Sequence, residues 1–344
     1  MNDVTPPLPD TRLAELTAWL ATSLGTRSIR LAPASADASF RRYFRVWDGA
    51  TTWIAMDAPP PNEDVRPFVS VARRLHAAGL SVPVVADADE ARGFLRLTDL
   101  GSTHYLAAFQ AGFTPEALYP SAARALCRMQ CDPSLGAGLT AYDASVMARE
   151  VSLFPDWFLR RHLDMEPGPS VLAIIARSLA VMTTAAAAQP QVFVHRDYHS
   201  RNLMLLDERG PGVLDFQDAI RGPVGYDLVS LYKDCYVRWP RDAVLGWVEE
   251  YRQLAVAGGL RLPGRDEFVR GFDLIGLQRH LKVLGIFARL WYRDGKASYL
   301  ADLPRVLAYV REVTLLYPEL AELEQFLVAE VEPRFAAAQR RVLG

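Results

Sequence analysis

The stretch that decides the fold of this 344-residue chain is VFVHRDYHSRNLMLLDERGPGVLDFQ, residues 192–217. An apolar run that ends at His195 predicts a buried strand, and a polar loop carrying Asp197 and Asn202 follows it. Residues 203–206 and 212–216 predict two further strands, joined by a turn at 207–211. The sequence therefore predicts a strand, a polar loop and a hairpin in immediate succession.

The predicted hairpin brings oxygen ligands together. If the turn is centred between Glu208 and Arg209, Asn202 lies opposite Asp215 on the same face. One amide oxygen and one carboxylate suit Mg²⁺, which keeps water and phosphate among its ligands. Asp197, five residues before Asn202, could orient and deprotonate a hydroxyl. The alternative is an ordinary hairpin with solvated ends.

The motif HRD-x4-N followed by DFQ resembles the catalytic loop and metal motif of the protein-kinase-like fold. With DFQ in place of DFG, it is closer to the aminoglycoside phosphotransferase-like small-molecule kinases. ASFRRYFRV, MDAPP and LTDLG further resemble the bacterial branch that phosphorylates N-acetylmuramate and N-acetylglucosamine at C1 in cell-wall recycling. The resemblance covers about residues 28–240 and implies a cytoplasmic enzyme that uses ATP and Mg²⁺.

The fold implied by this resemblance is α+β and two-lobed. A small β-rich N-lobe would span residues 1–97, and a larger, mainly helical C-lobe would span residues 98–344. The sequence pattern agrees with it. Helices are predicted at 13–24 and 65–78, and strands at 28–31, 42–47, 52–56, 82–85 and 94–97. Further helices are predicted at 117–129, 144–161 and 169–188.

The resemblance also implies roles for the loop residues. Asp197 would be the catalytic base, and Asn202 and Asp215 would bind Mg²⁺. His195 would support the loop from beneath. His199 would face the γ-phosphate as a cation, or would be an ordinary solvated loop histidine. Asp227 would brace the loop, although its position also suits a helix N-cap.

Two segments of the first hundred residues resemble nucleotide-binding elements. FLRLTDLG, residues 94–101, resembles the hinge, so that the carbonyl of Thr98 and the amide of Leu100 would bind adenine. A plain exit from a strand is the alternative. ADASFRRY, residues 36–43, lies where the phosphate-covering loop is expected, and Ser39 would let backbone N–H groups approach phosphate. An ordinary hairpin turn is the alternative there.

The N-lobe departs from the kinase pattern because it contains no lysine. Met56 lies where kinase-like enzymes place the lysine that holds the α- and β-phosphates, and the chain's three lysines come much later, at Lys233, Lys282 and Lys296. Either the protein is inactive, or an arginine supplies the charge bidentately. The candidates are Arg41, Arg42 and Arg45, of which Arg41 and Arg42 are favoured, and Glu63 is the nearest candidate for the acidic partner.

The acceptor is less well defined. Lys233 and Arg238 would face the carboxylate of a lactyl-bearing sugar, or would be solvated helix residues. Aminoglycosides and other amino alcohols are the rival substrates, but they favour an acidic pocket, whereas Arg279, His280 and Lys282 make the C-lobe partly cationic. An ATP-binding pseudokinase is the rival of another class.

Composition narrows the class of protein. Lys and Arg total 38 against 40 Asp and Glu, a formal charge of −2, which does not suit a nucleic-acid partner. Three cysteines cannot form a disulfide framework, and Cys127 and Cys131 suit core packing better than a metal site. The N-terminus has no signal-peptide pattern. The apolar tract 171–188 contains Arg177 and predicts a buried helix, with no membrane partner. The oligomeric state is not indicated.

Overall fold

The computed structural model describes residues 10–36, 40–206 and 210–343. Contacts between residues divide the chain into two units. The first comprises residues 1–102 and 204–218, and the second comprises residues 103–203 and 219–344. The boundary predicted at residues 97/98 stays a prediction. The segment 204–218, which contains Asp215, belongs to the first unit, whereas Asp197 and Asn202 belong to the second.

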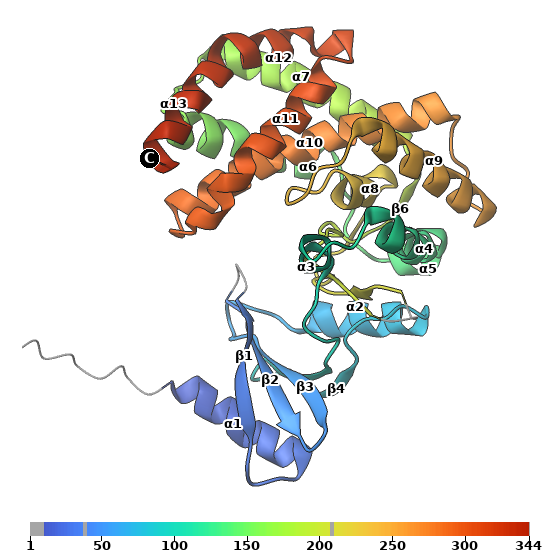
Figure 1. Cartoon of the computed structure of the whole chain (residues 1–344), viewed down its shortest axis with the longest axis vertical. Coiled ribbons are helices and arrows are strands. Elements are labelled where there is room, and N and C mark those ends of the chain that lie inside the picture. The colour runs from blue at the N-terminus through green and yellow to red at the C-terminus, as the bar shows by residue number, and fades with distance from the viewer. Residues whose placement is uncertain (1–9, 37–39, 207–209, 344) are drawn as a thin grey trace, which may run out of the picture. The chain divides into compact units, whose positions relative to one another are not determined.

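The first unit is built on a five-stranded antiparallel sheet of order β1-β2-β3-β5-β4. Helix α1, Thr11–Leu24, packs on this sheet through Leu16 and Leu20, which meet Phe44, Val46 and Phe94 in one core (Figure 1). Because alternate strand residues face the helix, the sheet buries one apolar face there. The strands are β1 (Arg30–Ala36), β2 (Arg42–Asp48), β3 (Thr51–Asp57), β4 (Val85–Asp89) and β5 (Phe94–Thr98).

The same unit includes the short hairpin that carries Asp215. Its strands are β7, Leu203–Met204, and β8, Gly212–Val213. Helix α2, Arg66–Ala77, contacts it where the rings of Phe68 and Phe216 lie 4.8 Å apart. The Val213 amide donates to the Ser81 carbonyl at 2.8 Å. These contacts explain why the hairpin clusters with the N-terminal unit.

The second unit is mainly helical, and its longest helix, α10, is Arg265–Tyr292. Gly285 lets α10 approach the π-helix η1, Phe154–His162, because a Cβ at this position would lie 2.3 Å from the Leu153 backbone. The other helices are α3 (Tyr105–Gln110), α4 (Pro115–Cys131), α5 (Pro133–Gly136), α6 (Ala144–Val151), α7 (Pro169–Ala188), α8 (Gly225–Tyr232), α9 (Arg241–Ala257), η2 (Ala297–Asp302), α11 (Leu303–Thr314), η3 (Pro318–Leu320), α12 (Ala321–Phe326), η4 (Leu327–Val331) and α13 (Glu332–Leu343). A small sheet pairs β6, Gln191–Val194, with β9, Ile220–Pro223.

Most predicted elements are confirmed, and four need correction. The predicted strand 28–31 is instead β1, which begins at Arg30 and ends at Ala36. The predicted strand 82–85 is instead β4, which begins at Val85. The hairpin strands are two residues long rather than four or five. The predicted helix 144–161 is interrupted after Val151 and continues as η1, because Pro155 cannot donate the amide hydrogen bond that a continuous helix needs.

Helix α7 has the length and apolar composition of a membrane span. Within its apolar stretch, 22% of the residues are buried inside the structure. The buried face carries Val171, Ile175, Ser178, Met182 and Ala186. The prediction of a buried helix is therefore correct for one face only.

Candidate active site

The catalytic loop begins where β6 ends, at His195. Asp227, fully buried on α8, accepts hydrogen bonds from the backbone amides of His195, at 2.7 Å, and Arg196, at 3.0 Å. Arg196 has a left-handed φ of +78°, which these bonds hold in place. Burial raises the pKa of Asp227 to about 7, against the opposing effect of the two amides. Asp227 thus braces the loop and is not an N-cap, a position occupied by Val224.

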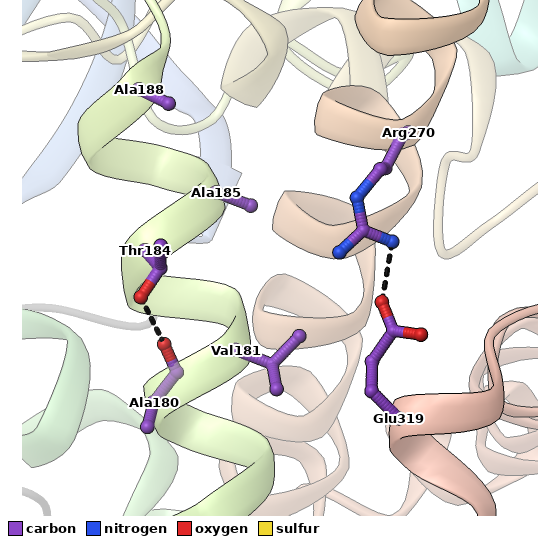
Figure 2. Close-up of a pocket in the computed structure, with 7 residues that line it drawn as sticks. All are labelled: Ala180, Val181, Thr184, Ala185, Ala188, Arg270 and Glu319. Carbon is purple, nitrogen blue, oxygen red and sulfur yellow. Dashed lines mark hydrogen bonds and ion pairs between the residues drawn. The ribbon is translucent and has the colours of Figure 1, made fainter.

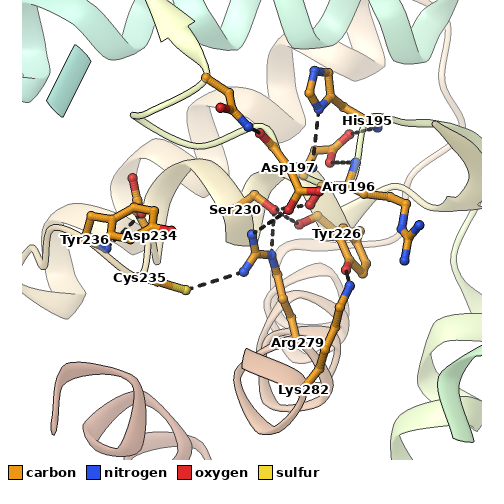
Figure 3. A network of polar contacts seen from close by, with 12 residues as sticks. His195, Arg196, Asp197, Tyr226, Ser230, Asp234, Cys235, Tyr236, Arg279 and Lys282 are labelled. Atoms are coloured by element: carbon orange, nitrogen blue, oxygen red, sulfur yellow. Dashed lines mark hydrogen bonds and ion pairs between the residues drawn. The ribbon is translucent and has the colours of Figure 1, made fainter. Parts of the chain in front are cut away.

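Asp197 presents a partly exposed carboxylate, 43% accessible, beside buried cations. Arg279 NH2 lies 3.9 Å from Asp197 Oδ1, and Figure 3 shows Arg279 and Lys282 projecting from α10 toward the loop. Burial alone would raise the pKa of Asp197, but Lys282, His199 and Arg279 outweigh it and lower that pKa. The carboxylate is therefore ionised at neutral pH, as a base must be.

Asn202 is tied back to the same loop. Its Nδ2 donates to the Asp197 carbonyl at 3.0 Å, which identifies Oδ1 as the atom of this amide that suits a metal. Hard oxygen donors from one amide and one carboxylate fit Mg²⁺. Asn202 and Asp215 lie in different units, so their predicted pairing stays a prediction.

Glu150 anchors the loop from α6 and was not predicted from the sequence. Its carboxylate accepts from Tyr142 Oη at 2.5 Å and from Gln278 Nε2 at 3.2 Å. It also pairs with Lys282 Nζ at 2.8 Å and closely with Arg196. Burial would raise its pKa, but the charges of Lys282 and Arg196 lower it to about 2. Glu150 therefore fixes the side chain of Arg196, which precedes Asp197, the candidate base.

Arg279 is the second side chain that sequence reasoning left without a role. Its Nε donates to Ser230 Oγ at 2.7 Å and its NH1 to Cys235 Sγ at 3.5 Å. The side chain is only 4% exposed. The polar and charged run at 278–282 in the otherwise apolar middle of α10 was a usable signal, but the partners of Arg279 lie 44 and 49 positions away.

In the N-terminal unit, Arg41 lies between two carboxylates. Its Nε is 3.8 Å from Glu63 Oε2 and its NH2 is 3.8 Å from Asp215 Oδ1. Asp215 has φ +62°, a conformation that Asp tolerates, and accepts from Gln217 Nε2 at 2.8 Å. The structure therefore brings together the candidate arginine, its candidate acidic partner and the candidate metal ligand.

The other two arginines have different partners. Arg42 Nε donates to Asp57 Oδ2 at 3.0 Å, and Asp57 also pairs with Arg12 at 2.7 Å. Arg45 Nε pairs with Asp99 at 2.6 Å. Since successive residues at a strand point to opposite faces, Arg41 and Arg42 diverge at the start of β2.

The predicted adenine-binding residues lie at and after the end of β5. Thr98 is the last residue of this strand, and its hydroxyl accepts from the Val84 amide at 2.9 Å. Leu100 follows two residues later and packs against Gly212 of β8, where an added Cβ would lie 3.0 Å from Leu100 Cδ1. Ser39, predicted near phosphate, lies outside the described residues.

His199 lies deep in the C-terminal unit. Burial lowers its pKa, and the neighbouring carboxylates of Asp234 and Asp197 only partly oppose this. Its ring lies 5.3 Å from that of Tyr236, edge to face. A neutral imidazole at neutral pH does not match the cation that the resemblance implied.

The predicted acceptor residues Lys233 and Arg238 already have carboxylate partners. Lys233 is 1% exposed, and its Nζ lies 3.0 Å from both Asp273 Oδ1 and Glu312 Oε1. Arg238 NH2 lies 3.1 Å from Glu312 Oε2. The neutralised, buried ammonium of Lys233 offers no charge to a substrate.

A separate open groove of about 520 Å³ lies along α7 (Figure 2). Small side chains of α7 line one wall, and the ion pair between Arg270 and Glu319 lines the other. None of the catalytic-loop residues borders it, so it is not the candidate active site.

Comparisons with known proteins agree with this geometry. The model of the family described as "Phosphotransferase enzyme family" matches residues 30–266. A protein of Pseudomonas aeruginosa named N-acetylmuramate/N-acetylglucosamine kinase is 46% identical over 331 residues, covering 93% of this chain and 97% of the relative. A protein of Neisseria meningitidis with the same name is 43% identical, covering 92% and 95%.

Solved structures show the fold. An ADP-bound aminoglycoside phosphotransferase is 14% identical and superposes with a TM-score of 0.58, covering 87% of this chain and 98% of that one. A choline/ethanolamine kinase family protein of Mesorhizobium loti is 17% identical, with a TM-score of 0.62, covering 96% and 99%. The predicted kinase-like α+β fold is confirmed.

Proposed function

The chain belongs to the phosphotransferase enzyme family and is a kinase with an alcohol acceptor, and from this premise we propose that it uses ATP and Mg²⁺ to phosphorylate the C1 hydroxyl of N-acetylmuramate and N-acetylglucosamine. The observation that carries the proposal is identity of 43–46%, over more than nine-tenths of the chain, to relatives named for these two sugars. The intact catalytic loop supports an active enzyme over a pseudokinase.

In this proposal Asp197 accepts the proton of the anomeric hydroxyl as that oxygen attacks the γ-phosphorus of ATP, and the bond from the γ-phosphorus to the oxygen that bridges it to the β-phosphate breaks and releases ADP. The Asp227 brace and the Glu150 anchor hold the loop so that the carboxylate is positioned before the acceptor arrives. An anomeric hydroxyl is more acidic than an ordinary alcohol, so a carboxylate of lowered pKa suffices as its base.

Asn202 Oδ1 and the Asp215 carboxylate would hold Mg²⁺, which would neutralise charge on the phosphates. Arg41 would supply the phosphate-binding charge that kinases usually draw from a lysine, and Glu63 would orient it. Thr98 and Leu100 would bind the adenine edge through their backbones. The enzyme would act in the cytoplasm on a free sugar, without a nucleic-acid or membrane partner.

The test is a coupled assay of ADP release. The full chain receives ATP and Mg²⁺ with N-acetylmuramate, N-acetylglucosamine, glucose or kanamycin, and EDTA serves as the metal control. We expect turnover with the two N-acetyl sugars, loss of turnover in EDTA, and a C1 phosphate by phosphorus NMR. Turnover with kanamycin alone, or phosphate at another hydroxyl, contradicts the proposal.

A further inference from the structure

The cations around the loop differ in whether a carboxylate of the protein contacts them. Arg196 and Lys282 both pair with Glu150, and Arg279 lies against Asp197. Arg201, on the same loop, forms no ion pair within 4 Å with any residue that the structure describes. Of these four cations, Arg201 is the one without a contacting carboxylate among the described residues.

Arg201 is held instead by aromatic rings. Its Cζ lies 3.7 Å from the centre of the Tyr236 ring and 5.7 Å from that of Tyr299. A guanidinium over an aromatic face is held by the ring electrostatically, and its N–H groups remain able to donate to an anion. The platform is fixed, because the Tyr236 amide donates to Asp234 Oδ1 at 2.9 Å and its ring packs on Phe287.

The nearest acidic groups have their own donors. Asp302 pairs with Arg305, and Asp234 accepts from the amides of Ser200, at 2.9 Å, and Tyr236. Neither carboxylate lies within ion-pair distance of the Arg201 guanidinium in the described part of the chain. The half-buried guanidinium is therefore ready for an external anion.

We infer that Arg201, stacked on Tyr236, binds the lactyl carboxylate that distinguishes N-acetylmuramate from N-acetylglucosamine. The inference rests on the proposed function and deepens it by naming the residue that sets preference between the two sugars. Arg201 replaces Lys233 and Arg238 in this role, because both of those cations are committed to Glu312.

Position in the chain supports this assignment. Arg201 follows Asp197 by four residues, a separation of at most about 14 Å even in extended chain. A sugar whose C1 hydroxyl lies at Asp197 can thus present a second group to Arg201. Planar bidentate pairing suits a carboxylate, and the adjacent Tyr236 ring offers an apolar face to the sugar.

The experiment compares Arg201→Met with the wild-type chain on both sugars. Loss of a charge-assisted pair should raise KM for N-acetylmuramate about 10- to 100-fold. KM for N-acetylglucosamine and KM for ATP should stay within about two-fold of the wild-type values, because Arg201 is proposed to contact only the lactyl carboxylate, which neither molecule carries. Arg201→Lys should give an intermediate KM for N-acetylmuramate, because it keeps the charge and loses the planar fork. Arg177→Met, at an exposed arginine paired with Glu322, is the matched control.

Each other outcome overturns the inference in a recognisable way. An equal loss on both sugars assigns Arg201 to loop structure, and a rise in KM for ATP assigns it to a nucleotide phosphate. A selective loss in Arg238→Met, with Arg201→Met unchanged, restores the earlier candidate. Failure of the wild-type chain to phosphorylate either sugar contradicts the proposed function itself, before any variant is measured.

Discussion

Each unit contains a cluster of charges, and the two clusters differ in the residue at their centre, an arginine in the N-terminal unit and a glutamate in the C-terminal unit. In the first unit, Arg41 lies 3.8 Å from each of two carboxylates, Glu63 and Asp215. In the second, Glu150 lies within hydrogen-bond distance of Lys282, Arg196 and Tyr142. The first cluster includes Asp215, the candidate metal ligand, whereas the second holds the loop through Arg196.

Charge alone therefore does not identify a binding residue. The charges of Arg196 and Lys282 act on Asp197, the proposed base, yet they are balanced internally by Glu150. Removing one member of such a buried network leaves the other charges without compensation. The network therefore resists rearrangement and positions the loop. Arg41, which lies 3.8 Å from the candidate metal ligand Asp215, is the better candidate for phosphate.

The largest effect is expected from a substitution at Asp197, which follows the loop residue held by the Glu150 cluster. Asp197→Asn should lower kcat by about 10²–10⁴, nearer the lower value because an anomeric hydroxyl needs little base assistance. KM for ATP should change little, since the nucleotide-binding residues are untouched. Steady-state kinetics on both sugars measure this, with the thermal unfolding midpoint as a check of folding. Near-wild-type kcat removes Asp197 from the mechanism.

Glu150→Gln tests whether the Glu150 cluster stabilises the folded chain. It leaves Lys282 and Arg196 buried without their carboxylate and should cost about 3 kcal/mol of unfolding free energy at pH 7. Urea unfolding measures the cost. Glu166→Gln, at an exposed glutamate paired with Arg160, should cost less than about 1 kcal/mol. Equal costs for the two variants would show that the buried network contributes nothing beyond a surface pair.

The stability difference between wild type and Glu150→Gln has a defined pH dependence. The pKa of Glu150 is about 2 in the folded chain, below its ordinary value of 4.5. As pH falls from about 4.5 to 2, the unfolded chain takes up a proton that the folded chain does not, so the wild-type chain loses stability. The difference in unfolding free energy between the two proteins should therefore shrink over this interval, which urea unfolding at a series of pH values measures.

A smaller effect is expected from a substitution in the Arg41 cluster. Arg41→Met should raise KM for ATP about 10- to 100-fold by removing a charge-assisted phosphate contact, with the unfolding midpoint nearly unchanged. Arg66→Met, at an exposed arginine paired with Asp64, is the control. If Arg42→Met raises KM for ATP and Arg41→Met does not, the phosphate charge belongs to Arg42 and the comparison between the clusters fails.

The sequence alone determined the features that are local in the chain. The strand before Asp197 and the helices around it follow from short apolar patterns, so the α+β class could be predicted. Asp197 and Asn202 fall within six consecutive residues, so the candidate loop could be proposed from the sequence. Asp227 could be placed only as a cap or a brace, because its bonds to His195 and Arg196 span more than 30 residues.

Tertiary structure decided which partner each charge takes. Arg201 lies within the HRD-x4-N motif and Lys233 lies downstream of it. Lys233 pairs with Asp273, 40 residues away, whereas Arg201 lies over the ring of Tyr236. Glu150 reaches Gln278 across 128 residues. Because a buried charge must be compensated, burial forces each of these charged groups to take a partner. No local pattern encodes that choice, because the compensating side chains come from helices that meet only when the core has packed.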